Sequence, residues 1–282
     1  MANNTLSGPL PTELVHMPHA SYLYLFYNEF TGTIPIDWYT ANPKLREFSV
    51  GGNKLEGSIP SAIGNLVDLK NFRIYQNSLT GTLPPEVGNM NSVYNFVTQY
   101  NRLRGTLPES MTNWQMINSL WLHKNLFTGT IPSVLGAFNA SLSSLILRDN
   151  SFNGTIPNQV WKLTTLTQLD LSSNDLSGTL SSSIGNLDKW LMWFYLQNNK
   201  KISGHIPSTI AKITKLAFFY IEGTGLVGSI PEAFCQLRSS QGLQYVEANC
   251  LANNSTGKAM VECPSGCCTT CCDATGLFCQ QM

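Results

Sequence analysis

The 282-residue sequence has few charged side chains and no excess charge of either sign. Asp, Glu, Lys and Arg make up 12 % of the residues, which is about half their usual share in soluble domains. Lys plus Arg and Asp plus Glu both number 17, so the formal net charge is zero. A chain without a positive field has nothing to hold phosphate backbones or anionic lipid. We therefore expect no nucleic-acid partner.

Long apolar runs are also missing. The longest, Trp190 to Leu196, has seven residues, whereas a membrane span needs roughly 20. The first residues contain neither the charged nor the apolar region of a secretory signal, and Thr5 to Pro11 already reads as the second half of a repeat. The sequence therefore predicts a chain that begins in mid-repeat, with any signal or membrane span outside it.

What the sequence does contain is one repeat of 24 to 25 residues. In the copy from Leu45 to Pro60, apolar residues two apart are followed by Asn53, Gly57 and an Ile-Pro pair. The frame returns often enough to make nine full copies after an initial half. The further copies cover residues 69–84, 93–108, 117–132, 142–157, 166–181, 191–207 and 216–231, and an earlier one carries Leu23, Leu25, Asn28, Gly32 and Pro35.

Each position of the repeat has a physical role. Apolar residues two apart, such as Leu120 and Leu122, lie on one face of a short strand, which the next coil must cover. The recurring Asn supplies an amide where the chain leaves the strand, and Gly-x-Ile/Leu-Pro predicts a regular bend. Because one copy cannot bury its own apolar face, we expect neighbouring coils to stack with their strands in parallel.

The pattern LxxLxLxxNxLxGxIPxxLGxL resembles the plant-type leucine-rich repeats of receptor-like kinases, receptor-like proteins and secreted inhibitors. The resemblance covers residues 4 to about 250. It implies a repeat solenoid, that is, a curved right-handed α/β superhelix with a parallel sheet on its concave face and short 3-10 or helical turns on its convex side. Such a fold gives almost no information about which ligand the protein binds.

All the cysteines lie in the last 48 residues, which divides the chain into repeats over 1–234 and a cysteine-rich C-terminal cap over 235–282. An even number in one terminal segment predicts disulfides and an oxidising compartment. Cys235 and Cys250 flank a strand-like stretch, and we expect them to pair. Metal binding through Cys268-x-x-Cys271 is the less favoured alternative, because a second Cys-x-x-Cys and nearby histidines are absent. The cysteines are Cys235, Cys250, Cys263, Cys267, Cys268, Cys271, Cys272 and Cys279.

The cap and the sequons point to the secretory route. The string from Cys263 to Cys272 is similar to the tail of diatom leucine-rich-repeat proteins, some of which resemble receptor-like chains with one membrane span and an outer solenoid. Asn-x-Ser/Thr sequons, which are acceptors for N-linked glycans, also occur. They lie at Asn3, Asn139, Asn153, Asn253 and Asn254.

Aromatic residues and arginine are frequent where the strand frame points side chains out of the expected concave face, and these residue types dominate protein interfaces. We predict a contact surface for a peptide, a protein or a cell-wall glycan, with a co-receptor as a further partner. High strand propensity alone is the alternative explanation for these aromatics. The predicted contact residues are Arg73, Tyr75, Tyr100, Trp121, His123, Arg148, Tyr195 and Tyr220.

The sequence strings that could suggest catalysis or cofactor binding lack the structural context that such sites need. Gly223 to Gly228 matches the G-x-G-x-x-G string, but these residues occupy positions of the repeat rather than a turn between a strand and a helix. Kinase motifs are missing, and the frame places no nucleophile beside His123. We therefore predict an extracellular or cell-surface recognition module that is not an enzyme and has no cofactor. A secreted inhibitor of a wall-degrading enzyme and a structural wall or matrix protein are the alternatives.

Overall fold

The computed structural model describes residues 2–17, 19–42, 44–240, 242–251 and 260–282. The chain divides into two compact units, Met1–Thr128 and Gly129–Met282. The following description treats each unit by itself.

In the first unit, one short strand from each coil enters a parallel sheet, here called the main sheet. Neighbouring strands pair in register, so that Phe48, Phe72, Phe96 and Leu120 lie opposite one another. These four side chains are fully buried, as the alternation of apolar residues predicts. The strands are β2 (Tyr22–Tyr24), β4 (Glu47–Ser49), β6 (Asn71–Arg73), β7 (Asn95–Val97) and β9 (Ser119–Trp121).

The second unit builds a main sheet in the same way, and the cap extends it. Leu145, Leu169, Phe194, Phe219 and Val246 form its buried row. The predicted boundary at residues 234 and 235 lies inside a short helix, and two further parallel strands follow it before an antiparallel one. The strands are β11 (Ser144–Ile146), β13 (Gln168–Asp170), β15 (Trp193–Tyr195), β17 (Phe218–Tyr220), β19 (Tyr245–Ala248), β21 (Thr270–Cys272) and β22 (Cys279–Gln281).

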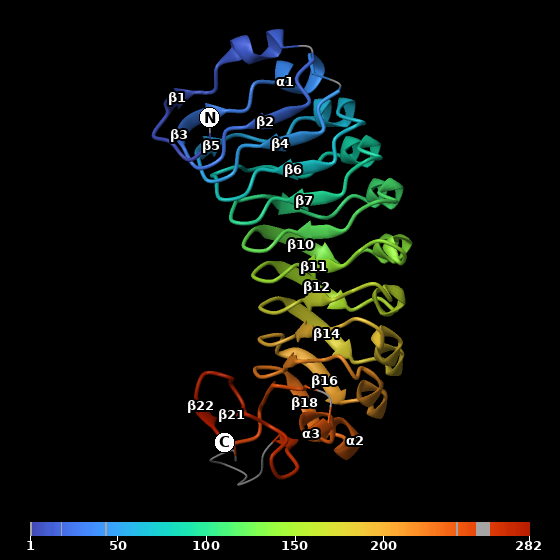
Figure 1. Cartoon of the computed structure of the whole chain (residues 1–282). Helices are drawn as coiled ribbons and strands as arrows, with labels where there is room; N and C mark the ends of the chain where they lie inside the picture. The colour runs from blue at the N-terminus through green and yellow to red at the C-terminus, as the bar shows by residue number, and fades with distance from the viewer. Residues whose placement is uncertain (1, 18, 43, 241, 252–259) are drawn as a thin grey trace. The chain divides into compact units, whose positions relative to one another are not determined.

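Further parallel strands form where the sequence predicted only a bend (Figure 1). They make two sheets, one of three strands (β1, β3 and β5) and one of seven strands (β8 to β20), here together called the flank sheet. In its five-residue strands the fourth residue is glycine, and Gly57 directly follows the three-residue strand β5. At Gly57, which has a φ of +85°, an added Cβ would lie 2.8 Å from Thr33 Cγ2, so the strands pair closely only because that Cβ is absent. The strands are β1 (Ser7–Pro9), β3 (Glu29–Thr33), β5 (Lys54–Glu56), β8 (Arg104–Gly105), β10 (Leu126–Thr130), β12 (Ser151–Thr155), β14 (Asp175–Thr179), β16 (Lys201–His205), β18 (Gly225–Ser229) and β20 (Val261–Glu262).

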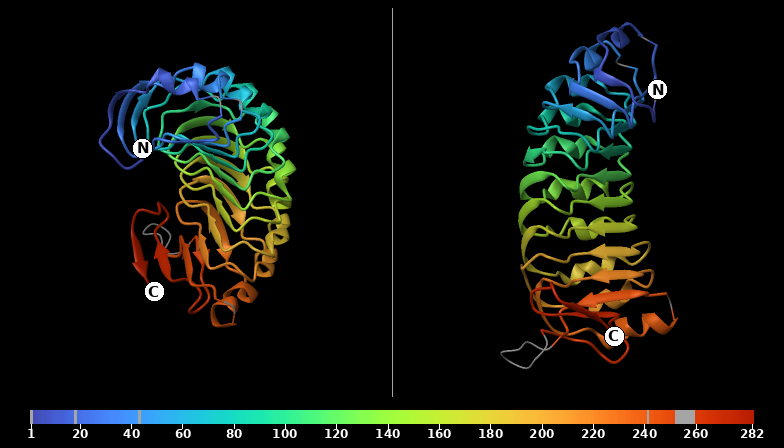
Figure 2. Two further views of the ribbon diagram at one scale, coloured as in Figure 1. Left: turned by 45° about the horizontal axis from the view of Figure 1, so that its top comes forward. Right: turned by 90° about the vertical axis from the view of Figure 1, so that its left-hand side faces the viewer.

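Short helices return the chain on the side of each coil away from the main sheet, as predicted (Figure 2). No helix among the described residues combines the length and the apolar character needed to cross a membrane. The 3-10 helices are η1 (Thr12–His16), η2 (Ser61–Asn65), η3 (Pro85–Asn89), η4 (Glu109–Asn113), η5 (Ser133–Phe138), η6 (Val160–Lys162), η7 (Ser182–Leu187) and η8 (Ser208–Lys212), and the α-helices are α1 (Asp37–Thr40), α2 (Glu232–Cys235) and α3 (Leu237–Ser240).

The recurring asparagine joins each coil to the one before it. Asn101 Nδ2 donates to Thr98 O in its own coil at 3.1 Å and to Ile74 O in the preceding coil at 3.0 Å. Its Oδ1 accepts from Leu79 N at 3.0 Å. One buried amide thus satisfies three backbone groups that the turn leaves unpaired. Thr224 occupies the position of the recurring asparagine in its coil. In the next coil the asparagine is present again as Asn249, whose Oδ1 accepts from Gly223 N at 2.7 Å.

Replacing Asn101 by Ala should lower the free energy of unfolding by about 2 kcal/mol, because buried backbone groups lose their partners. The control is Asn91→Ala, since Asn91 is exposed. Thermal or urea unfolding of both variants measures the difference. Equal stability of the two would show that the amide column does not hold the coils together.

The eight cysteines form four disulfides, which confirms a stapled cap. The predicted Cys235–Cys250 pair is wrong. Cys250 follows β19 and bonds to Cys271 of the adjacent strand β21, whereas Cys235 at the end of α2 bonds to Cys267. The prediction considered only the strand that lies between the two cysteines in sequence and missed the later strand that lies beside it. The other two bonds are Cys263–Cys268 and Cys272–Cys279.

Peptide mapping of the oxidised, unreduced chain should recover the Cys235–Cys267 and Cys250–Cys271 links, because those sulfurs face each other in the folded cap. Mass spectrometry before and after reduction identifies the linked peptides. No free thiol should react under denaturing, non-reducing conditions. A recovered Cys235–Cys250 peptide would contradict this arrangement.

Candidate recognition surface

In each unit, alternate residues of the main-sheet strands point away from the core and form the candidate surface. In the first unit the in-register row is Tyr24, Ser49, Arg73, Val97 and Trp121. Five of the predicted contact residues, Arg73, Tyr75, Tyr100, Trp121 and His123, belong to this unit. The other three belong to the second unit.

Arg73 is half-buried and already engaged. Its guanidinium lies 3.4 Å from Glu47 Oε2 and donates to Asn71 Oδ1 at 3.1 Å. Tyr24 Oη donates to the same carboxylate at 3.0 Å, and burial is the main cause that raises the pKa of Tyr24. Arg73 therefore presents a cation that is oriented and partly neutralised.

Tyr75 packs across the intervening coil toward Tyr27, with the ring centroids 6.0 Å apart and the planes nearly perpendicular. Burial and a hydrogen bond with Tyr27 raise the pKa of Tyr75 to about 12. The rings pass over Gly51 and Gly52, where a Cβ would collide with Tyr75 and Tyr27 respectively. Two glycines in one coil therefore make room for two tyrosines from its neighbours.

Arg73, Tyr75 and Trp121 line a shallow hollow of ≈ 370 Å³ in the first unit. Its wall includes Gln99, whose side-chain Oε1 is enclosed and accepts no hydrogen bond from any residue that the structure describes. A buried acceptor without a donor is costly, so a ligand N–H or O–H that reached it would be favoured. The remaining lining residues are Tyr27, Asn95, Val97 and Ser119.

His123 and Tyr100 form a separate contact. His123 is only 8 % exposed, and its ring meets that of Tyr100 edge-on at 5.4 Å. Tyr100 has a φ of +56°, so the chain turns there as it leaves the strand. Lys124 Nζ lies 5.3 Å from the Tyr100 ring centroid, a cation–π distance. Tyr100 is thus the exposed member of this group, and His123 supports it from below.

In the second unit, Arg148 lies between two carboxylates. Its Nε is 3.6 Å from Asp170 Oδ2, and a terminal nitrogen is 3.9 Å from Asp149 Oδ2. Asp170 also accepts from the amide and the hydroxyl of Ser172 at 3.1 and 2.6 Å. Burial nevertheless raises the pKa of Asp170. This grouping explains the two aspartates as partners of Arg148 rather than as a pair of catalytic carboxyls.

Tyr195 and Tyr220 lie side by side on neighbouring strands, with their rings edge-on and 5.1 Å apart. Burial is the main cause that raises the pKa of Tyr195 to about 12. The sequence prediction missed the row two positions earlier, Trp193, Phe218 and Tyr245, whose rings stack at 6.5 and 5.2 Å. Alternation along the strand would have found it, because residues two apart share a face.

Glu222 is the most perturbed acid described on this surface. It is 8 % exposed, and burial with the neighbouring charge of Glu247 raises its pKa from 4.5 to about 8. A carboxyl whose pKa rises on folding stabilises the fold fully below pH 4.5, and that stability is lost as the pH rises toward 8.

Replacing Glu222 by Gln should therefore flatten the fall in melting temperature between pH 5 and pH 8. Between pH 5 and pH 8 the free energy of unfolding of the variant should fall by about 2 kcal/mol less than that of the parent chain. Glu262→Gln, at an exposed position of β20, is the matched control. A pH profile of Glu222→Gln that parallels the parent profile would contradict the assignment.

Three of the predicted glycan acceptors, Asn3, Asn139 and Asn153, are exposed, and Asn153 lies on flank strand β12. Asn253 and Asn254 lie outside the described residues. The rejected G-x-G-x-x-G string leads into flank strand β18, and no helix begins at its last glycine.

A family model for the leucine-rich repeat matches residues 44–66, 141–163 and 165–187. These segments coincide with coils of the main sheet. The fold is a leucine-rich-repeat solenoid. Its repeats are of the plant type, as the sequence pattern predicted.

Receptor-like protein 36 of Arabidopsis thaliana is 38 % identical over 68 residues, which is 24 % of this chain and 10 % of that protein. The structure of the plant peptide hormone receptor RGFR1 in complex with RGF2 matches with a TM-score of 0.82 and 31 % identity, over 88 % of this chain and 38 % of that one.

The Arabidopsis receptor kinase HAESA, in complex with the peptide hormone IDA and the co-receptor SERK1, matches with a TM-score of 0.80 and 25 % identity, over 99 % of this chain and 42 % of that one. This leucine-rich-repeat chain thus spans well under half the length of each of these relatives.

Proposed function

We propose that this chain is the ligand-binding part of an extracellular, receptor-like protein and that it recognises a peptide or protein on the exposed face of its main sheets. The main supporting observation is the hollow of the first unit, which is lined by Arg73, Tyr75 and Trp121 together with Gln99, whose side-chain Oε1 has no donor among the described residues. Aromatic anchors, an oriented cation and an unsatisfied acceptor suit recognition of a peptide backbone. The RGFR1 and HAESA structures, which hold peptide hormones, support this choice.

Four disulfides and three exposed sequons favour an oxidising compartment, and therefore the cell surface or the extracellular space. The HAESA complex includes the co-receptor SERK1, which makes a co-receptor a reasonable second partner for this chain. We propose binding rather than catalysis, because His123 supports the ring of Tyr100 and Asp149 and Asp170 are occupied by Arg148.

Replacing Trp121 and Tyr100 together by Ala should abolish peptide capture and leave the melting temperature nearly unchanged, because both side chains reach the exposed face. The probe is a displayed library of random peptides, selected on the parent chain produced with its disulfides. Binding of the enriched peptides to the double variant is then measured by interferometry. A loss of at least about tenfold in affinity is expected, since hot-spot aromatics contribute 2 kcal/mol or more.

The matched control replaces Trp190 and Tyr94, which are 58 % and 43 % exposed, by Ala. It removes the same two residue types at positions outside the predicted contact set. Enriched peptides that bind both double variants equally would place the contact surface elsewhere. A library that yields no peptide specific for the parent chain would overturn peptide recognition.

A further inference from the structure

The second unit holds two carboxylates on the exposed face of its main sheet, and no described lysine or arginine forms an ion pair with either of them. Strands β17 and β19 pair in register, which places Tyr220 opposite Glu247. Glu222 follows Tyr220 by two residues, and both glutamates interact electrostatically with the Tyr220 hydroxyl. Glu247 is half-buried. Oε2 of Glu222 is fully enclosed and has no hydrogen-bond donor among the described residues, although the carboxylate does interact with its own backbone N–H. The pair therefore combines an accessible carboxylate with a deeper one in which one oxygen is without a donor.

Charge is balanced elsewhere on this face but not here. Arg148 lies beside both Asp149 and Asp170. The groups that interact electrostatically with Glu222 and Tyr220, by contrast, are the two carboxylates themselves and the side chain of Tyr245. No lysine or arginine of the described residues is among them, and burial alone raises the pKa of Glu247. Two like charges in a partly desolvated place without a counter-ion are unfavourable. A cation from outside the chain would remove this imbalance.

The cap encloses the deeper carboxylate. An added Cβ at Gly276 would lie 2.7 Å from Gly223 N, so the loop between Cys272 and Cys279 rests directly on the backbone beside Glu222. Asn249 accepts from Gly223 N at 2.7 Å and ties it to the same side of the cap. Because the disulfide closes this loop, it forms a fixed wall.

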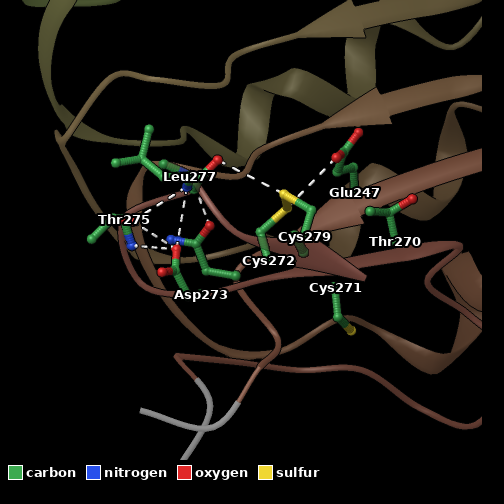
Figure 3. The surroundings of a disulfide bond; sticks show 12 residues. Glu247, Thr270, Cys271, Cys272, Asp273, Thr275, Leu277 and Cys279 are labelled. Atoms are coloured by element: carbon green, nitrogen blue, oxygen red, sulfur yellow. Dashed lines mark hydrogen bonds between the residues drawn. A yellow bond between two sulfur atoms is a disulfide. The ribbon is translucent and has the colours of Figure 1, made fainter. Parts of the chain in front are cut away.

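Figure 3 shows how Glu247 on β19 and Asp273 in the loop are oriented. The carboxylate of Glu247 points toward the disulfide, with Oε1 3.5 Å from Cys272 Sγ. Asp273 turns back into its own loop and accepts from the amides of Thr275 and Leu277 at 3.0 and 3.2 Å. Hydrogen bonds within this loop lower the pKa of Asp273. A third negative charge therefore lies at the same end of the sheet, and no ion pair joins it to a cation of the described chain.

Aromatic rings complete the surroundings. Tyr220 meets Tyr195 edge-on at 5.1 Å, and Tyr245 stacks on Phe218 at 5.2 Å with the planes inclined by 12°. Rings of this kind attract cations through their faces and offer apolar contact to a flat group. A guanidinium is planar, weakly hydrated and able to donate two hydrogen bonds to one carboxylate, whereas an ammonium is compact and strongly hydrated.

We propose that Glu222, Glu247 and Tyr220 form a subsite for the guanidinium group of an arginine side chain in a peptide ligand. This inference rests on the proposed function and names the chemistry of one contact. Glu247 receives the guanidinium at the surface, and Glu222 adds a second negative charge beneath it. A metal ion fits less well, because the groups of potential ligands found near Glu247 in the described chain consist of sulfurs that are already bonded in a disulfide.

The subsite makes binding depend on pH. The pKa of Glu222 is raised to about 8, so its carboxyl carries a proton at neutral pH. A bound cation favours the ionised form, and binding therefore releases a proton. The affinity for an arginine side chain should rise as the pH increases through 8 and level off above it.

The test uses the whole chain and two small probes, N-acetyl-arginine methylamide and its citrulline analogue. The probes have nearly the same shape, but citrulline carries no charge. Titration followed by NMR of the probe should show that the arginine probe binds at least about fivefold more tightly at pH 9, the gain expected of a charge-assisted contact. Its affinity should be at least about threefold lower at pH 6.5.

Variants separate the two carboxylates. Glu222→Gln should remove the pH dependence and retain part of the affinity, while Glu247→Gln should remove the preference for arginine over citrulline. Glu262→Gln, which makes the same chemical change on the flank sheet, should behave like the parent chain. Melting temperatures and thiol counts confirm that each variant is folded with its disulfides closed.

Equal binding of the arginine and citrulline probes to the parent chain would overturn the subsite, and so would an equally tight lysine analogue. These results are independent of the peptide library. A charge-selective subsite with no selected peptide would count against the proposed function alone. Peptides that bind the parent chain but bind Glu247→Gln equally well would count against the subsite alone.

Discussion

Each coil of this protein depends on its neighbour to cover its apolar edge, and the rest of the structure follows from that dependence. The central residues of the main-sheet strands are fully buried only because the next strand lies in register beside them. Asparagines such as Asn101 join successive coils through backbone groups that no coil satisfies by itself. A stack held together in this way leaves alternate strand residues exposed. A broad surface suited to contact is therefore a consequence of how the chain folds.

The same dependence creates a problem at the end of the stack, and the cap addresses it. A last coil would expose its strand edge and its apolar side. Strands β19 and β21 continue the main sheet, and the disulfides hold them there. The loop closed by Cys272 and Cys279 rests on the backbone next to Glu222. A segment that protects the core thus also shapes part of the exposed surface.

The two units use their exposed faces differently. In the first unit, an oriented arginine, two tyrosines and a tryptophan surround an open hollow with a buried acceptor. In the second, Arg148 lies beside two aspartates, and two glutamates form no ion pair with any lysine or arginine that the structure describes. The first surface calls for hydrogen-bond donors on its ligand, and the second calls for a positive charge. This chemical contrast says more about the identity of the ligand than the repeat itself does, because many proteins share the repeat.

The sequence by itself determined the repeat, the parallel strands, their buried rows, the short helices and the disulfide-rich end, because each of these follows from local spacing. It placed Arg73, Tyr75 and Trp121 on one face by alternation alone. The flank sheet, the Cys235–Cys267 and Cys250–Cys271 pairs, the burial of His123 and the carboxylate pair of Glu222 and Glu247 were decided only in the tertiary structure. Each of these features depends on which residues of different coils lie side by side, and on how much water the neighbouring coil excludes from them.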